Sequence, residues 1–377
     1  MTDFALYMHI PFCVRKCNYC GFISYSSRDL EVMNSYCEAL KREMELVSKR
    51  WWGSVSTIFL GGGTPTVLPT NQLEGLLESI YDFFNIKPLV EISIEANPGT
   101  VDLDKYKILL KGRVNRLSLG IQSFDDNLLK TMGRIHCKQD IYESYNLARK
   151  AGFDNINLDL IFGLPGQTLT NWQNTLKEAI ALQPEHISVY SLQIEEGTYW
   201  GNLAANGKLI LPGEDLELAM YQEAQSKLSA AGFEHYEISN FAKPGYKCRH
   251  NLTYWYNQYY IGIGAAAASF WQDERWRNYT DLKQYNQVLT KGSLPRGEIE
   301  ILTLKQQMAE TMFMGLRLIK GICLENFRQR FNLDVIDVYH EEIDYLLKTG
   351  LIEIVNNHLR LTSKGLPLAN EVFIHFV

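Results

Sequence analysis

The chain has 377 residues, of which 46% are hydrophobic and 21% are charged, and its formal net charge is -6. This length suffices for a large domain plus a smaller one, and the composition is ordinary for a globular protein. The negative charge gives no long-range attraction to nucleic acid or anionic lipid. The longest apolar run, residues 261–271, contains glycine and is too short to span a bilayer. We therefore expect a cytoplasmic protein that binds no nucleic acid.

Short apolar strands alternate with amphipathic helical patterns through the first part of the chain. The expected strands are residues 5–10, 57–60, 90–95, 116–120, 155–160 and 186–192. The helical patterns between them are residues 30–49, 72–84, 102–110, 141–151 and 172–182. Six strand-helix units predict a parallel sheet, because parallel neighbours need crossover connections, which are right-handed. The alternation becomes irregular after Leu192, so we predict an open α/β barrel of six units, (β/α)6.

The last part of the chain has a different pattern. Helical patterns at residues 305–318, 324–331 and 335–348 precede two short strands at 351–355 and 358–361. Three helices and a wing predict a small winged-helix-like domain. Its third helix carries Asp337, Glu341, Glu342 and Asp344, and these charges disfavour a DNA-bound regulator. We expect a barrel at residues 1–235, a segment that covers it at 236–299, and the winged-helix-like domain at 300–377.

Three closely spaced cysteines, Cys13, Cys17 and Cys20, follow the first expected strand. A four-iron cluster usually takes four thiolates, so three cysteines leave one iron open to a small molecule. A zinc site is the alternative, but structural zinc takes four ligands and His9 is the only further candidate nearby. A disulfide is disfavoured by the odd total of seven cysteines and by a reducing compartment. The spacing therefore favours an iron-sulfur cluster.

Polar residues follow the other expected strands and should meet at one rim, because functional loops lie at the carboxyl ends of parallel barrel strands. They include residues 61–66 (GGGTPT), 95–98 (EANP), 122–124 (QSF) and Asp159. An open iron suits a ligand with adjacent amine and carboxylate groups, and S-adenosylmethionine has both. Glycines let the backbone approach such a ligand, strand-end carboxylates such as Glu95 can hold ribose hydroxyls, and Arg134 can pair with a carboxylate. Taken singly, these residues also suit an ordinary turn, a helix cap and a surface charge.

Three segments carry a resemblance to a known family: residues 7–13 (YMHIPFC), 61–65 (GGGTP) and 157–165 (NLDLIFGLP). They resemble the radical S-adenosylmethionine (SAM) family of oxygen-independent coproporphyrinogen III oxidases and their heme-chaperone relatives. The resemblance implies a partial TIM barrel in which Cys13, Cys17 and Cys20 ligate a 4Fe-4S cluster whose remaining iron takes SAM. It also implies cofactor contacts from eight residues: Tyr7, Gly62, Gly63, Thr64, Glu95, Gln122, Arg134 and Asp159.

Two further features indicate the branch of that family. Phe22 stands where the oxidases have another cysteine, and the first strand begins almost at Met1, without the oxidases' N-terminal extension. Residues 248–255 (CRHNLTYW) resemble the His-Asn-X-X-Tyr-Trp signature of the heme-chaperone, HemW-type branch. That segment offers an imidazole at His250 and aromatic faces at Tyr254 and Trp255, which suit a porphyrin. Ala268 departs from the branch, which commonly has histidine there.

The resemblance implies a protein that binds heme and delivers it to acceptor hemoproteins. The other partners that it implies are an electron donor and, through the acceptors, a membrane surface. The alternative is an enzyme of porphyrin biosynthesis, oxygen-independent coproporphyrinogen III dehydrogenase, which decarboxylates propionate side chains by radical chemistry.

Overall fold

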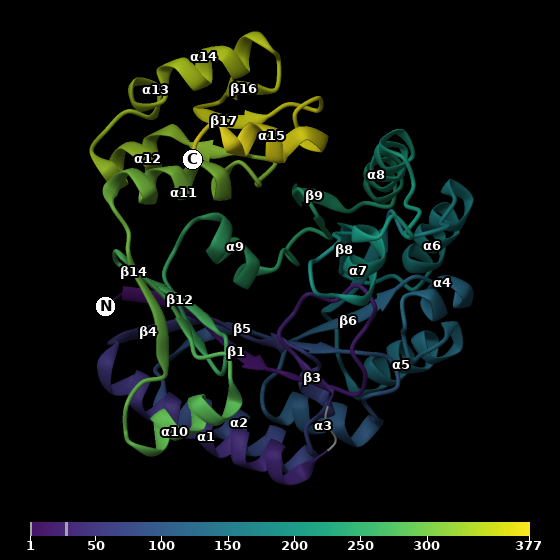
Figure 1. Ribbon diagram of the computed structural model, residues 1–377, viewed down its shortest axis with the longest axis vertical. Coiled ribbons are helices and arrows are strands. Elements are labelled where there is room, and N and C mark those ends of the chain that lie inside the picture. The colour runs from purple at the N-terminus through teal and green to yellow at the C-terminus, as the bar shows by residue number, and fades with distance from the viewer. Residues whose placement is uncertain (1, 27–28) are drawn as a thin grey trace.

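The computed structural model describes residues 2–26 and 29–377, and a curved parallel sheet forms its centre (Figure 1). Six strands lie side by side in chain order and pair in parallel. They are β1 (Thr2–Ile10), β4 (Gly53–Gly62), β5 (Ile86–Ala96), β6 (Arg116–Gln122), β7 (Ile156–Phe162) and β8 (His186–Ser191). The six-strand prediction is confirmed, and most of these strands are longer than the sequence pattern indicated.

Helices between these strands cover the outer, convex face of the sheet (Figure 1). They are α1 (Leu30–Arg50), α2 (Thr70–Phe83), α3 (Leu103–Lys111), α4 (Asp126–Thr131), α5 (Lys138–Ala151) and α6 (Leu169–Ala181). In α1, buried Met33, Leu40, Met44 and Val47 recur at helical spacing and form the stripe that packs on the sheet. Asp29 begins that helix, because its side chain accepts hydrogen bonds from the first free backbone N–H groups.

Six short strands that the sequence pattern did not predict extend the sheet at both edges. On the β8 side lie β10 (Asn240–Ala242) and β9 (Glu234–Glu237), and on the β1 side lie β11 (Tyr260–Ile263), β12 (Ala268–Trp271), β13 (Glu274–Asn278) and β14 (Arg296–Ile301). The helix α9 (Arg249–Trp255) lies in the stretch of chain that joins the two edges (Figure 1). Residues 236–299, which we expected to cover the barrel, therefore also supply strands of its sheet.

The C-terminal part has a hydrophobic core of its own. Its elements are α11 (Leu304–Gly315), α12 (Leu324–Phe331), α13 (Val335–Val338), α14 (His340–Lys348), α15 (Ala369–Ile374) and a small sheet of β15 (Ile322–Cys323), β17 (His358–Leu361) and β16 (Ile352–Val355). This is a winged-helix-like arrangement, as predicted. Backbone hydrogen bonds from Ile238 to Arg317, and from Ile319 to Tyr236, join it to β9.

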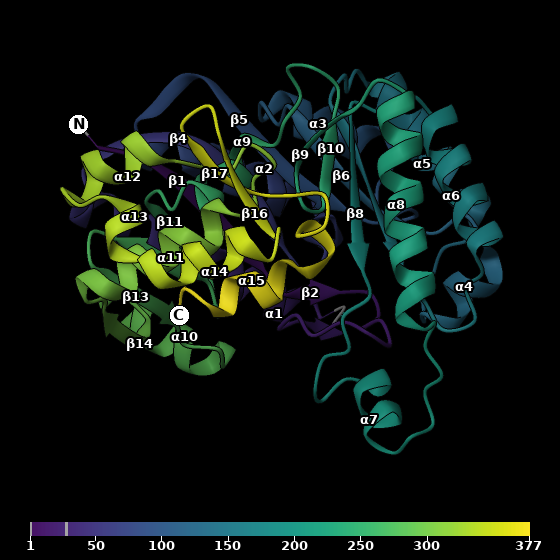
Figure 2. The same ribbon diagram turned by 90° about the horizontal axis from the view of Figure 1, so that it is seen from above.

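Two smaller features frame the rim of the barrel. The strands β2 (Phe12–Cys13) and β3 (Tyr25–Ser26) pair in parallel and bracket the cysteine loop. The segment with α7 (Tyr199–Ala205) projects beyond the end of β8, and α8 (Glu214–Ala230) follows it (Figure 2). Among the helices of the described residues, none is both long enough and apolar enough to cross a bilayer.

The strands alternate between an apolar outer face and a polar inner face. On β6 the buried side chains of Leu117, Leu119 and Ile121 belong to the hydrophobic core, whereas Arg116, Ser118 and Gln122 line an internal cavity. Strands covered on both faces are usually apolar throughout. A polar inner face therefore marks the inside of this barrel as a binding site rather than a packed core.

Candidate functional site

One internal cavity of about 670 Å³ contains nearly all of the predicted site residues. Cys13, Cys17 and Cys20 line it, as do His250 and Tyr254 of α9. All eight predicted contacts to SAM also line it: Tyr7, Gly62, Gly63, Thr64, Glu95, Gln122, Arg134 and Asp159. The cysteines follow the carboxyl end of β1, whereas α9 contacts β4 and β5 farther from the rim, so the two groups occupy different parts of the cavity.

The cysteine loop is held by its neighbours along the rim. The Asn18 backbone N–H donates to the carbonyl of Met132 at 2.9 Å, and its side-chain amide donates to the carbonyl of Thr131 at 2.8 Å. On the other side, the backbone N–H of Trp200 donates to the Asn18 carbonyl at 2.9 Å, and the Trp200 ring packs against Tyr19. The α4 and α7 segments thus position the residues between Cys17 and Cys20.

The three cysteine side chains all reach the same cavity. All three are partly exposed to the cavity and free of disulfides, and burial raises the pKa of the Cys13 and Cys20 thiols. Among the described residues, no group of three or more histidine, cysteine, aspartate or glutamate side chains converges closely enough to hold one metal ion. In a cubane each thiolate binds a different iron, so such convergence is not required.

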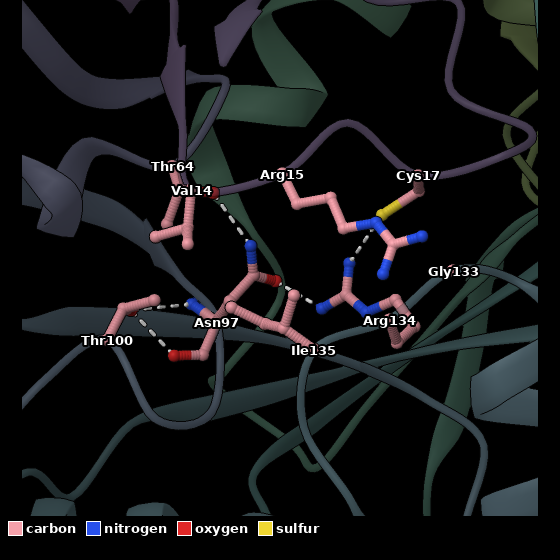
Figure 3. Close-up of a pocket in the computed structure, with 9 residues that line it drawn as sticks. All are labelled: Val14, Arg15, Cys17, Thr64, Asn97, Thr100, Gly133, Arg134 and Ile135. Carbon is pink, nitrogen blue, oxygen red and sulfur yellow. Dashed lines mark hydrogen bonds between the residues drawn. The ribbon is translucent and has the colours of Figure 1, made fainter. Parts of the chain in front are cut away.

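Arg134 joins the cysteine loop to the barrel wall, in the narrow pocket of Figure 3. Its Nη1 donates to Cys17 Sγ at 3.4 Å, and its Nη2 donates to Asn97 Oδ1 and to the carbonyl of Gly120. Asn97 in turn donates to Thr64 Oγ1 at 2.7 Å. The sequence predicts Arg134 and Thr64 as site residues, whereas it places Asn97 only in the polar loop of residues 95–98. The buried Nε of Arg134 has no partner among the described residues.

Two buried carboxyl groups face the middle of the cavity. Burial, together with the charge of Asp159, raises the pKa of Glu95 to about 8, although the Gly62 N–H donates to Glu95 at 3.1 Å. Burial also raises the pKa of Asp159, which accepts hydrogen bonds from Ser118 and Asn157. Near them, Gln122 Oε1 is buried and has no partner among the described residues. This region can therefore accept hydrogen bonds from a ligand.

Helix α9 brings its histidine to the barrel wall. His250 Nδ1 lies 3.0 Å from Thr57 Oγ1 on β4, and Nε2 lies 2.9 Å from the Tyr254 hydroxyl. Burial and the charge of Arg116 lower the pKa of His250 to about 3, so the imidazole is neutral. Trp255 does not line the cavity, and its ring packs on the Arg317 guanidinium at 4.4 Å. Ala268, on β12, also lies outside the cavity lining.

Comparison with known proteins identifies the family. A model described as the Radical SAM superfamily matches residues 7–179, and one described as the HemN C-terminal domain matches residues 302–368. The heme chaperone HemW of Bacillus subtilis is 40% identical over 377 residues, with 99% of each chain covered. The chain belongs to the HemW branch of the radical SAM superfamily. The HemW of Escherichia coli is 40% identical over 268 residues, which cover 71% of this chain and 70% of that protein.

A solved structure supports the same fold for this HemW-family chain. Coproporphyrinogen III oxidase (HemN) of Escherichia coli, described as a radical SAM enzyme, is 28% identical with a TM-score of 0.87, and the match covers 100% of this chain and 90% of that one. The family and the fold class that the sequence predicted are thus confirmed. Membership of the superfamily implies a 4Fe-4S cluster and SAM.

Proposed function

We propose that this protein is a radical SAM heme chaperone that binds heme beside its cluster site and delivers it to acceptor hemoproteins. One observation carries the proposal. The cysteine loop and the His250–Tyr254 face of α9 line the same cavity, so a porphyrin held by α9 would share a chamber with the cofactor. The names of the HemW relatives support heme as the ligand.

At the rim, Cys13, Cys17 and Cys20 would hold the cluster and the surrounding side chains would hold SAM. When bound, the cluster and SAM supply one-electron radical chemistry. Gly62 and Gly63 line the cavity with backbone atoms, although their missing side chains leave room for the His9 ring and the residue 10–12 backbone rather than for a ligand. Gln122 Oε1 is free to accept a hydrogen bond from a ligand. Tyr7, Thr64, Glu95, Arg134 and Asp159 complete the proposed contacts and keep this part of the cavity polar.

At the other end, His250 and Tyr254 are the proposed heme contacts. A neutral imidazole is the form that binds iron, and the His250 pKa of about 3 keeps it neutral. Both ring nitrogens are hydrogen bonded, so iron binding at Nε2 requires the Tyr254 hydroxyl to move aside. Trp255, the third predicted heme residue, would act from outside the cavity by holding α9 against Arg317.

The remaining parts of the proposal concern partners and location. Delivery requires acceptor hemoproteins, and the cluster requires an electron donor. We propose that the protein works in the cytoplasm and reaches membranes only through its acceptors. The exposed side chain of Phe22, which lines the cavity beside Cys20 and has 66% of its surface accessible, is a candidate contact for such partners.

The test is a heme titration of anaerobically reconstituted protein whose iron and sulfide contents have been measured. We expect a saturable shift of the Soret band at stoichiometric hemin. His250→Ala should weaken binding, while His340→Ala, a substitution of an exposed histidine in the C-terminal domain, should leave it unchanged. If the wild-type protein gives no saturable shift, the chaperone proposal is wrong.

A second candidate function follows from the likeness to HemN. Its TM-score of 0.87 favours oxygen-independent coproporphyrinogen III dehydrogenase activity, whereas Phe22 replaces the further cysteine of the oxidases. An anaerobic assay with reductant, SAM and coproporphyrinogen III distinguishes the two functions. We expect no catalytic formation of protoporphyrinogen IX, and sustained turnover would replace the chaperone proposal with the enzymatic one.

A further inference from the structure

Arg116 is a buried cation that faces the cavity without a hydrogen-bond partner among the described residues. It is the first residue of β6, only 2% of its surface is exposed, and it lines the cavity. Its Nε is buried and unpartnered, and its guanidinium forms no hydrogen bond or ion pair with any other residue that the structure describes. Burial alone would lower the pKa of Arg116, but the nearby Cys248, Glu91 and Asp159 side chains outweigh this effect and raise it, so the charge itself is balanced. The buried N–H groups still have no acceptor, which costs free energy, and a ligand oxygen would satisfy them.

The acidic groups around Arg116 are already engaged by other donors. Glu91 accepts from the backbone N–H groups of Arg249 and His250 and from the Cys248 thiol. Asp159 accepts from Ser118 and Asn157, as described above. These carboxylates balance the charge of Arg116 from a distance, but they leave its N–H groups free.

The neighbouring histidines do not compete for an anion. Burial and the charge of Arg116 lower the pKa of both His186 and His250, so both rings are neutral. His186 is also fully engaged, since its ring nitrogens contact Asn157 Oδ1 and the Tyr236 hydroxyl. Among the described lining residues at this end, Arg116 is therefore the charged donor that remains available.

The position of Arg116 excludes the amino-acid part of SAM as the source of that anion. Arg116 begins β6 and Gln122 ends it, so six residues at about 3.3 Å each place them roughly 20 Å apart. The cysteines and Arg134 lie at the Gln122 end, where Arg134 bonds both Cys17 and the Gly120 carbonyl. An anion at Arg116 must come from a second ligand that reaches the inner end beside His250.

We propose that Arg116 binds a carboxylate of this second ligand, and that the carboxylate is a propionate of a porphyrin. The planar guanidinium matches a carboxylate through two parallel hydrogen bonds. His250 and Tyr254 line the same end of the cavity. The iron of one porphyrin could therefore bind the His250 imidazole while a propionate at the edge of its ring binds the Arg116 guanidinium. This inference rests on the proposed heme binding and names the group of the porphyrin that is recognised.

The test compares hemin with hemin dimethyl ester, in which both carboxylates are blocked. We expect wild-type protein to bind hemin about ten- to a hundredfold more tightly, as for one charge-assisted bidentate pair. Arg116→Gln should bind hemin about as weakly as the wild type binds the ester, and Arg116→Lys should keep part of the preference. Arg277→Gln, which removes an exposed arginine on β13, should keep all of it.

Failure of propionate recognition and failure of heme binding give different results. If hemin and its ester bind the wild type equally, Arg116 does not recognise a propionate; this result needs no variant and stands even if Arg116→Gln fails to fold. If Arg116→Gln weakens SAM binding but keeps the preference for hemin, the carboxylate belongs to SAM and the proposal is wrong. If hemin does not bind at all, the chaperone function fails and this inference fails with it.

Discussion

The Glu91 carboxylate on β5 accepts a hydrogen bond from the backbone N–H of His250 at 2.9 Å and so fixes α9 to the barrel wall. It also accepts from the backbone N–H of Arg249 at 3.0 Å. Both donors belong to the first turn of α9, whose N–H groups have no partner within the helix. The orientation of His250 toward the cavity therefore depends on a residue more than 150 positions earlier in the chain.

Glu91→Gln should loosen α9 without disturbing the cysteine loop. The amide keeps one acceptor oxygen but turns an N–H₂ group toward a backbone donor, so we expect a loss of about 1–3 kcal/mol in the free energy of unfolding. Hemin affinity should fall, while the iron and sulfide contents stay at wild-type values. Glu298→Gln, at an exposed position on β14, is the control. Unchanged hemin affinity in Glu91→Gln would show that α9 does not need this anchor.

The alternation of strands and helices predicted the six parallel strands because each is long and apolar enough to give a clear pattern. The strands of residues 234–301 gave no such pattern, since β10 has only 3 residues and β11 only 4. Their pairing is set by distant partners. For example, Tyr260 pairs with Ala5, which lies 255 positions earlier in the chain. The residues next to Tyr260 in the sequence do not indicate such a contact.

The rim of the site and the α9 residues His250 and Tyr254 could be predicted, but the part of the barrel wall beside α9 could not. Glu95 and Gln122 stand at the carboxyl ends of β5 and β6, where position alone suggests function. Arg116 and His186 lie at strand beginnings, which usually face away from a barrel's active site. The polar-apolar alternation of residues 116–122 (RLSLGIQ) was the available signal, since a period of two assigns Arg116 and Gln122 to the same face.

The buried carboxyl group of Glu43 should make the free energy of unfolding depend on pH. Glu43 on α1 is 1% exposed and accepts from Tyr285, Asn278 and the Gly264 N–H, and burial raises its pKa to about 7. Between about pH 4.5 and 7 the folded state therefore binds a proton that the unfolded state lacks, so this group lowers the free energy of unfolding as pH rises.

Glu43→Gln removes that dependence. At pH 5 we expect it to lower the free energy of unfolding by about 1–2 kcal/mol, because its amide cannot accept from all three donors. The deficit should shrink toward pH 8, where the wild type carries the cost of the buried charge. Urea unfolding at pH 5, 6, 7 and 8 measures this, with Glu45→Gln on the exposed face of α1 as the control. A deficit that is constant with pH would mean that Glu43 stays ionised.

The loop between β11 and β12 contains a strained alanine. Ala266 has a φ of 63°, a left-handed conformation that disfavours any side chain. We expect Ala266→Gly to raise the free energy of unfolding by about 0.5–1 kcal/mol, as measured by urea unfolding. The same substitution at its neighbour is the matched control. Ala265→Gly should instead destabilise, because Ala265 is fully buried and is not among the residues with positive φ.

The raised pKa of Glu95 should couple SAM binding to proton release. At pH 7 the free protein holds a proton on Glu95, whose pKa is about 8, and a ligand with a cationic sulfonium favours the ionised carboxylate. The contribution of Glu95 should therefore tighten SAM binding about tenfold between pH 7 and 9. The affinity of Glu95→Gln for SAM should not show this tightening. The amine of SAM also titrates with pH, but its effect on affinity is the same for both proteins and therefore cancels when their affinities are compared. Equilibrium dialysis of reconstituted protein across this pH range gives the two affinity profiles. If the two profiles run parallel, Glu95 does not lose its proton when SAM binds, and its carboxyl group then accepts from the Gly62 N–H rather than contacting the ligand.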